Sequence, residues 1–187
     1  MEKKEAIILD RDGTLIEDPG YAFKIEDFQL LSGVIEGLKI LQKPFLLFIV
    51  TNQAGIGKGY YTEQEFHKYN DHLIQILNVN QIRIERTFYC PHLSEDNCEC
   101  KKPKLKFMTE IIDGWDVDIK NSWVIGDHPS DILFGINAGS KTVYLTTGYG
   151  MNHIHELKDQ GIKPTMIKSN FLNTAKKIIK MKESNDI

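Results

Sequence analysis

The chain has 187 residues, 41% of them hydrophobic and 26% charged, with a formal net charge of −3 and an isoelectric point near 6.1. This size and apolar content suffice for one buried core, so we expect a single domain over residues 1–187 with a frayed tail at 183–187. The weakly acidic balance argues against an extended nucleic-acid surface, and no apolar stretch has the length of a membrane span.

Short apolar segments alternate with segments of helical periodicity along the chain. We expect strands near 5–10, 45–51, 82–89, 122–126 and 141–145, a short sixth strand at 165–167 and a last helix at 170–182. Apolar residues recur at helical spacing between the strands, for example at Val34, Leu38 and Leu41. This alternation predicts an α/β fold, a Rossmann-like parallel sheet with helices on both faces.

The first predicted strand ends in two carboxylates, Asp10 and Asp12, followed by Gly13. Ligands of open parallel sheets bind beyond the carboxyl ends of strands, and side chains two residues apart in an extended segment share a face. Both carboxylates can therefore reach one small ligand. The alternative is a hairpin turn at Asp12-Gly13, which is disfavoured because no alternating strand follows Gly13.

Polar residues also follow two later strands and open one helix. The run at 45–50 ends in Thr51-Asn52, the run at 122–125 ends in Gly126-Asp127 with Asp131 four residues on, and Lys101-Lys102-Pro103-Lys104 precedes a predicted helix. Alone, Thr51 would be interpreted as a strand-end residue bonded to its own backbone, and each lysine as a solvated charge. Together with the first two carboxylates, they predict one polar site.

The order of these residues resembles the four motifs of the haloacid dehalogenase (HAD) superfamily over about residues 5–150. The matching segments are Asp10-x-Asp12-Gly13-Thr14, Thr51-Asn52, Lys102-Pro103 and Gly126-Asp127-x-x-x-Asp131. Within that superfamily, 51–63 and 90–103 look like the heptose-bisphosphate phosphatases and the related histidinol-phosphate phosphatases. The resemblance implies a HAD-like fold, and the short segment between Asp12 and Val34 leaves no room for a large cap domain.

The resemblance further implies a Mg²⁺-dependent phosphomonoester hydrolase in which Asp10 attacks phosphorus and becomes an aspartyl-phosphate. Carboxylates repel a phosphate dianion unless a cation intervenes, and Mg²⁺ prefers oxygen ligands. By the family pattern, Asp10, Asp127 and the backbone carbonyl of Asp12 hold Mg²⁺. The carboxylate of Asp12 is then available to protonate the leaving oxygen and to deprotonate the attacking water.

Thr51 and Lys102 are expected to hold the phosphoryl oxygens, and Asp131 to orient Lys102 or a metal-bound water. The residues expected to contact the rest of the substrate are Asn52, Lys101 and His128. Lys101 and His128 depart from the usual residues of these families, and Arg and Lys are not interchangeable in bidentate recognition. The expected partner is a small phosphorylated metabolite: first D-glycero-D-manno-heptose 1,7-bisphosphate, then histidinol phosphate. A nucleic-acid end phosphatase or binding module is the third possibility.

Three cysteines and one histidine lie within eleven positions, as Cys90-x-His92 and Cys98-x-Cys100. Zinc binds such a set tetrahedrally, and four protein ligands leave no open position for catalysis, so we predict a structural zinc loop over 90–100. The named phosphatases carry a Cys₃His loop of this order. The alternative is free surface cysteines beside an incidental histidine. Few cysteines and a charged N-terminal segment indicate a reducing, cytoplasmic location, and we expect a monomer.

The remaining expectations concern the mouth of the site. Without a large cap, the mouth should be open and bordered by loops at 17–28 and 55–61 and by the zinc loop. His153 and His155 follow Gly150 and are expected to lie solvated at a helix start.

Overall fold

Six parallel strands form a single sheet in the order β3-β2-β1-β4-β5-β6 in the computed structural model, which describes residues 3–185. The strands are β1 (Ala6–Leu9), β2 (Leu46–Asn52), β3 (Arg86–Cys90), β4 (Trp123–Gly126), β5 (Lys141–Leu145) and β6 (Met166–Lys168). The predicted α/β class with a parallel sheet is confirmed.

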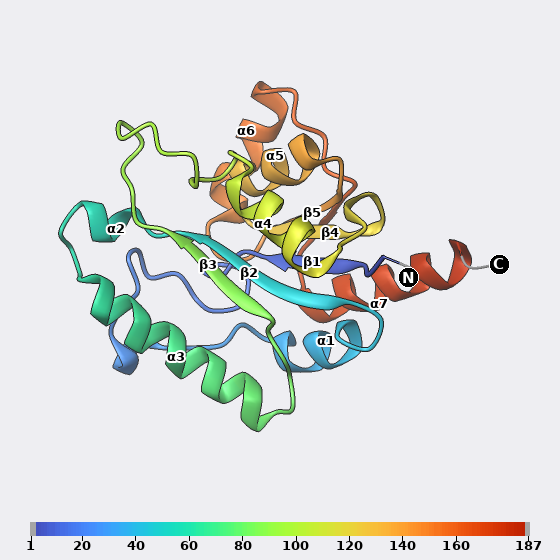
Figure 1. The fold of residues 1–187 in the computed structure, drawn as a ribbon, viewed down its shortest axis with the longest axis horizontal. Helices are drawn as coiled ribbons and strands as arrows, with labels where there is room; N and C mark the ends of the chain where they lie inside the picture. The colour runs from blue at the N-terminus through green and yellow to red at the C-terminus, as the bar shows by residue number, and fades with distance from the viewer. Residues whose placement is uncertain (1–2, 186–187) are drawn as a thin grey trace.

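Helices cover both faces of the sheet (Figure 1). One layer holds α1 (Val34–Leu41), α3 (Glu63–Val79) and α7 (Phe171–Asn185), and the other holds α4 (Lys106–Trp115), α5 (Pro129–Ala138) and α6 (Gly150–Asp159). A short helix, α2 (Ala54–Gly57), follows β2, and two 3₁₀ turns lie at Ile25–Asp27 and Ile119–Asn121.

The core consists of two main apolar clusters separated by the sheet. Strand β1 contributes Ile7 and Leu9 to the cluster that includes residues of α1, α3 and α7, and Ala6 and Ile8 to the cluster that includes residues of α4. All four residues are buried, because helices cover both faces of a parallel sheet. Strand β1 is therefore apolar along its whole length, because both of its faces are covered by helices.

Two predicted boundaries differ from the structure. Strand β3 begins at Arg86 instead of residue 82, because Gln81 turns the chain with φ 60° and the backbone N–H of Arg83 donates to the Gln42 side chain at 3.1 Å. Helix α7 continues to Asn185, beyond the predicted end at 182 and into the segment expected to be frayed. Residues 186–187 lie outside the described part of the chain.

The strand order places the site. From β1 the chain adds β2 and β3 on one side, then crosses to β4 and adds β5 and β6 on the other. Ligands bind at such a reversal of strand order, beyond the carboxyl ends of the strands. β1 pairs directly with both β2 and β4, so Asp10, Thr51 and Asp127 emerge at neighbouring strand ends.

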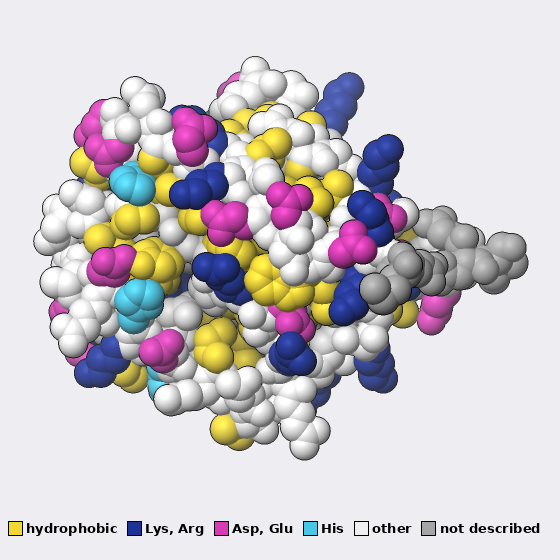
Figure 2. Space-filling view, viewed as in Figure 1, with side chains coloured by type: hydrophobic (Ala, Val, Ile, Leu, Met, Phe, Trp, Pro, Cys, Tyr) yellow, Lys and Arg dark blue, Asp and Glu magenta, His cyan; other side chains and the backbone are white. Residues whose placement is uncertain are grey.

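The surface carries charges of both signs. Basic and acidic side chains are interspersed over the face shown in Figure 2, without a stripe of one sign. Among the helices of residues 3–185, none is sufficiently long and apolar to cross a membrane.

Candidate active site

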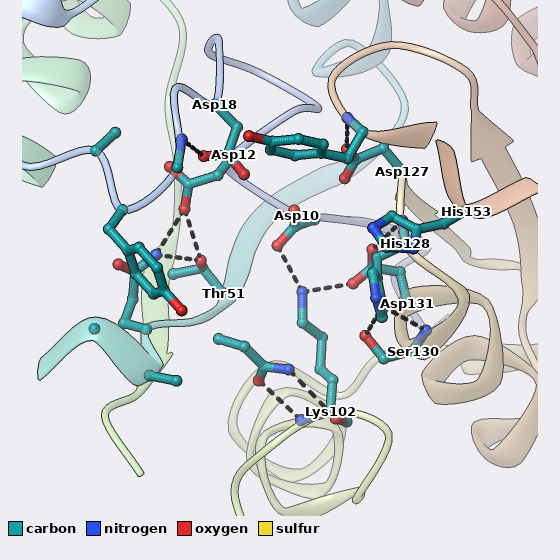
Figure 3. A pocket seen from close by; sticks show the side chains of 18 of the residues that line it. Asp10, Asp12, Asp18, Thr51, Lys102, Asp127, His128, Ser130, Asp131 and His153 are labelled. Carbon is teal, nitrogen blue, oxygen red and sulfur yellow. Dashed lines mark hydrogen bonds and ion pairs between the residues drawn. The ribbon is translucent and has the colours of Figure 1, made fainter. Parts of the chain in front are cut away.

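The carboxyl ends of β1, β2 and β4 open into a pocket of about 450 Å³ (Figure 3). Most of the predicted site residues line this pocket: Asp10, Asp12, Thr51, Asn52, Lys102, Asp127, His128 and Asp131. Segments from both halves of the chain therefore supply the polar groups of one cavity. This is the arrangement predicted from the polar residues that follow the strands in the sequence.

Lys102 occupies the base of the pocket, where its side chain extends between two carboxylates (Figure 3). Its Nζ lies 2.6 Å from Asp10 Oδ1, 2.6 Å from Asp131 Oδ1 and 2.6 Å from the carbonyl oxygen of Val50. The side chain of Lys102 is only 3% exposed, so these contacts fix its ammonium group in one place. The contact with Asp131 is the orienting contact expected from the sequence.

The backbone of Lys102 is held by Asn52 at the end of β2. The N–H of Lys102 donates to Asn52 Oδ1 at 3.0 Å, and Asn52 Nδ2 donates to the carbonyl oxygen of Lys102 at 3.3 Å. This reciprocal pair joins residues that are far apart in the sequence. Asn52 thus positions the lysine, in addition to lining the pocket where a substrate contact was expected.

Asp12 lies at the opposite side of the pocket from Asp131 (Figure 3). Its carboxylate accepts hydrogen bonds from Arg11 Nη2 at 3.0 Å, from Gln53 Nε2 at 2.7 Å and from Thr51 Oγ1 at 3.4 Å. The Arg11 guanidinium lies over the rings of Phe66 and Tyr69 and is fully buried. Charge-assisted bonds of this kind hold the Asp12 carboxylate at the pocket edge.

The turn after β1 requires a glycine. Gly13 has a φ of 74°, and a Cβ built there would lie 2.0 Å from Asp127 Oδ2. The same Asp127 oxygen accepts the backbone N–H of Tyr149 at 3.1 Å. Gly13 therefore turns the chain and lets Asp127 approach the first motif, and the hairpin alternative does not occur, since β1 pairs only with parallel strands in the described sheet.

Burial and like charge set the electrostatics of the site. Burial, opposed by Lys102 and reinforced by Asp131 and Asp12, raises the pKa of Asp10 to about 7. Burial, together with the charges of Asp10 and Asp131, raises the pKa of Asp127 to about 9. Burial disfavours the ammonium of Lys102, but Asp10 and Asp131 outweigh it and raise the pKa of Lys102 above its ordinary value. One ammonium thus faces more carboxylate charge than it can balance.

This excess of negative charge fits a divalent cation. Oxygens of Asp10, Asp127 and Asp131 lie within 4.8 Å of one another. Asp131 uses Oδ1 for Lys102 and Oδ2 for the backbone N–H of His128 at 3.0 Å, so both of its oxygens already accept from the protein. Lys102 contacts one oxygen of Asp10, and the backbone N–H of Tyr149 contacts one oxygen of Asp127. Each of these two carboxylates therefore has a second oxygen that can bind Mg²⁺.

Two residues, Lys101 and His153, differ in placement from the sequence expectations, whereas His128 lies in the pocket as expected. Lys101 donates from Nζ to Ser94 Oγ at 3.0 Å and is not among the described residues that line the pocket. His128 lines the pocket and caps α5, with its Nδ1 accepting the backbone N–H of Ser130 at 3.2 Å; burial lowers the pKa of His128. His153 was expected in solvent, but it lines the pocket because α6 places its ring 4.9 Å from that of His128.

The predicted zinc ligands converge at the end of β3. Cys90 Sγ lies 3.5 Å from Cys98 Sγ and 3.1 Å from Cys100 Sγ, and His92 Nδ1 lies 3.2 Å from Cys100 Sγ. Zinc bonds of about 2.0–2.3 Å place tetrahedral ligand atoms roughly 3.3–3.8 Å apart, so the four side chains fit a zinc ion with little adjustment. Cys90 and Cys100 are buried and Cys98 is partly buried, which argues against the alternative of free surface cysteines beside an incidental histidine.

Removing zinc from the loop is expected to lower the melting temperature by about 5–10 °C and to reduce activity, because Cys100 lies two residues before Lys102. The measurement is thermal unfolding and kinetics of protein treated with a chelator under reducing conditions, with zinc content determined by mass spectrometry. Ser94→Ala in the same loop is the control and should retain zinc. Unchanged melting and kinetics in verified zinc-free protein would contradict this coupling.

The pocket is lined by Asp18, Gly20, Tyr21 and Ala22 of the expected 17–28 loop and by Gly55 and Tyr61 of the expected 55–61 loop. Gln53, Ala54 and Tyr149, which lie outside both loops, line it as well. The zinc loop does not line the described pocket. It packs behind α2, where the N–H of Gly57 donates to the carbonyl oxygen of Pro91 at 3.0 Å.

Several residues that hold the site together by hydrogen bonds were not predicted from the sequence. Gln53 donates to both Asp12 and Thr51 and accepts the hydroxyl of Tyr61 at 2.5 Å, and Thr147 donates to the carbonyl oxygen of Gly13 at 2.7 Å. Gln53 directly follows Thr51-Asn52 and could have been proposed from its position. Thr147 and Tyr149 follow the fifth predicted strand, whose carboxyl end borders the same edge of the sheet.

Comparisons with known proteins agree with this site. The family model described as "HAD-hyrolase-like" matches residues 99–174. The chain is 42% identical over 144 residues to the D-glycero-alpha-D-manno-heptose-1,7-bisphosphate 7-phosphatase of Campylobacter jejuni, covering 76% of this chain and 83% of that protein. It is 40% identical over 154 residues to the corresponding beta-heptose enzyme of Haemophilus ducreyi, covering 78% of this chain and 85% of that protein.

The fold has a close counterpart among solved structures. The D,D-heptose 1,7-bisphosphate phosphatase of B. bronchiseptica, complexed with magnesium and phosphate, superposes with a TM-score of 0.85 at 24% identity over 95% of this chain and 99% of that one. The resemblance found in the sequence is confirmed. The chain belongs to the HAD-like hydrolases, in the family of D-glycero-D-manno-heptose-1,7-bisphosphate 7-phosphatases.

Proposed function

We propose that the protein is a Mg²⁺-dependent phosphatase that removes the 7-phosphate of D-glycero-D-manno-heptose 1,7-bisphosphate. The observation that carries this proposal is Lys102 held between Asp10 and Asp131 beside Asp127, in a chain 42% identical to a curated enzyme of that activity. The pocket of about 450 Å³ is of a size suited to a sugar phosphate and not to an extended polymer.

In this proposal, Asp10 attacks the phosphorus of the 7-phosphate through a carboxylate oxygen, and the bond to the sugar oxygen breaks. Asp10, Asp127 and the Asp12 carbonyl would hold Mg²⁺, which would supply positive charge to the phosphoryl oxygens. Lys102 holds the Asp10 carboxylate in line and faces the phosphoryl group with its ammonium, and the Thr51 hydroxyl donates to a phosphoryl oxygen.

Asp12 moves the protons in both steps. In the first step its carboxyl group gives a proton to the departing sugar oxygen, so the sugar leaves as an alcohol. In the second step the Asp12 carboxylate takes a proton from the water that attacks phosphorus, which frees phosphate and restores Asp10. Arg11 and Gln53 hold Asp12 at the pocket edge for this role.

The substrate is tested by measuring phosphate release from the alpha and beta anomers of heptose 1,7-bisphosphate, from histidinol phosphate and from glucose 6-phosphate. We expect kcat/KM for one heptose anomer to exceed that for histidinol phosphate by at least about 100-fold, because each tenfold factor needs only about 1.4 kcal/mol of added transition-state contact. A higher kcat/KM for histidinol phosphate would overturn the heptose assignment while retaining the phosphatase. Phosphate release from a 5′-phosphorylated oligonucleotide would favour the nucleic-acid alternative.

A further inference from the structure

A cluster of histidines at the edge of the pocket has no part in the proposed reaction. His128 caps the start of α5, and His153 and Glu156 lie one helical turn apart on α6. Their metal-binding atoms all lie within 4.8 Å of one another, and the two imidazole rings are 4.9 Å apart at 63°. Figure 3 shows the two rings side by side, next to Asp127 and Asp131.

The Nδ1 atom of each imidazole ring lies within hydrogen-bond distance of a neighbouring polar group. His153 Nδ1 lies 2.5 Å from Glu156 Oε1, and since a carboxylate only accepts, His153 donates from Nδ1, and the neutral ring then has its lone pair on Nε2. This carboxylate–histidine arrangement is the one that orients metal-binding histidines in proteins.

His128 can present Nε2 in the same way. Its Nδ1 lies 3.2 Å from the backbone nitrogen of Ser130, as an acceptor, and 2.9 Å from Ser130 Oγ. With the proton on Nδ1, the ring donates to Ser130 Oγ over the shorter distance, and Nε2 offers its lone pair. A cation would select this tautomer, at the expense of the longer bond.

We propose that His128 and His153 bind a divalent transition-metal ion through their Nε2 atoms, with Glu156 holding His153 in place. Imidazole nitrogens favour Zn²⁺, Ni²⁺ and Cu²⁺, whereas the carboxylates of Asp10 and Asp127 favour Mg²⁺, so the two sites select different ions. Metal–nitrogen bonds of about 2.1 Å place two ligand atoms roughly 3.4 Å apart. The potential ligand atoms of the cluster lie within 4.8 Å of one another, so small side-chain rotations would close the site.

The test is a calorimetric titration of Ni²⁺ into tag-free, zinc-loaded protein in excess Mg²⁺, so that the cysteine loop and the carboxylates are already saturated. We expect His153→Phe, which keeps an aromatic ring beside His128 but has no lone pair, to weaken Ni²⁺ binding at least tenfold. His155→Phe is the matched control: His155 lies two residues away on α6 and is exposed, and the affinity should not change.

A second variant guards against misfolding. If His153→Phe does not fold, as judged by circular dichroism, then Glu156→Gln retains both rings and should weaken Ni²⁺ binding several-fold, because the amide orients His153 less strongly than the carboxylate. Equal affinity of the wild type and the folded variants, or no Ni²⁺ binding by the wild type, would overturn the proposal. Because binding is measured as heat, its outcome is independent of the heptose phosphatase assignment.

Discussion

Replacing Asp10 by Asn is expected to lower the rate of phosphate release at least ~1000-fold. The amide keeps the shape of the side chain but has no charged oxygen to attack phosphorus, and it offers Mg²⁺ a weaker ligand. Lys102, whose Nζ lies 2.6 Å from Asp10 Oδ1, would still be paired with Asp131, so the fold should survive. Phosphate release from heptose 1,7-bisphosphate under single-turnover conditions is the measurement.

The matched control is Asp113→Asn, the same substitution at an exposed position of α4. It should leave the rate unchanged. In the wild type, beryllofluoride soaked with Mg²⁺ should attach to Asp10, and the Asn variant should not bind it. Phosphate release by Asp10→Asn at the wild-type rate, or beryllofluoride bound elsewhere in the pocket, would show that the covalent assignment is wrong.

Replacing Lys102 by Met is expected to affect both activity and stability. Removing one partner of a buried charge pair costs about 3–5 kcal/mol, because the remaining charges are left without compensation. Here the uncompensated groups are Asp10 and Asp131, both within 2.6 Å of the lost ammonium. The rate of phosphate release should fall by about 100–1000-fold, as for the loss of one charge-stabilising donor.

The stability loss of Lys102→Met should depend on pH. Without the ammonium, the carboxylate of Asp10 has a pKa above that of the unfolded chain, since burial already raises the pKa of Asp10 and the opposing charge of Lys102 is lost. Such a group binds more protons in the folded state, so the deficit in stability is small at pH 5 and grows as the pH rises towards 8. Urea unfolding at both pH values without added Mg²⁺ measures this trend.

Lys104→Met provides the comparison for this prediction. Lys104 is a partly exposed lysine of the same segment whose Nζ pairs with Glu99 at 3.5 Å, and exposed pairs contribute little to stability. Its replacement should change neither the rate nor the unfolding free energy by more than a small amount. A stability deficit in Lys102→Met that does not vary with pH would contradict the explanation by unpaired carboxylates.

The sequence predicted the sheet and the main catalytic candidates because both depend on short-range patterns. Strand β1 and most of β2 are continuous apolar runs, Asp10 and Asp127 come directly after strands, and Thr51 lies near the end of β2. The position of strand β3 was less predictable, since its start depends on a bond between Arg83 and the distant Gln42. A local sequence pattern does not indicate such a long-range contact.

The residues of the site that were not predicted also depend on long-range contacts. Nothing near Lys102 in the sequence shows that the amide of Asn52 holds its backbone on both sides. Likewise, the pattern around His153 is that of a solvated helix start, and only the packing of α6 against α5 brings its ring to His128. The candidate catalytic groups predicted from the sequence therefore lie together in one pocket, whereas several residues that position them were not predicted.

The strand order also links ligand binding to the stability of the fold. Strands β1–β3 come from the first half of the chain and β4–β6 from the second, and the two groups meet only where β1 pairs with β4. In the proposed mechanism Mg²⁺ would be held by Asp10 on one side of this junction and by Asp127 on the other. Ligand at about 100 times its dissociation constant would therefore raise the unfolding free energy by about 2.7 kcal/mol, acting as a clamp between the two halves of the sheet.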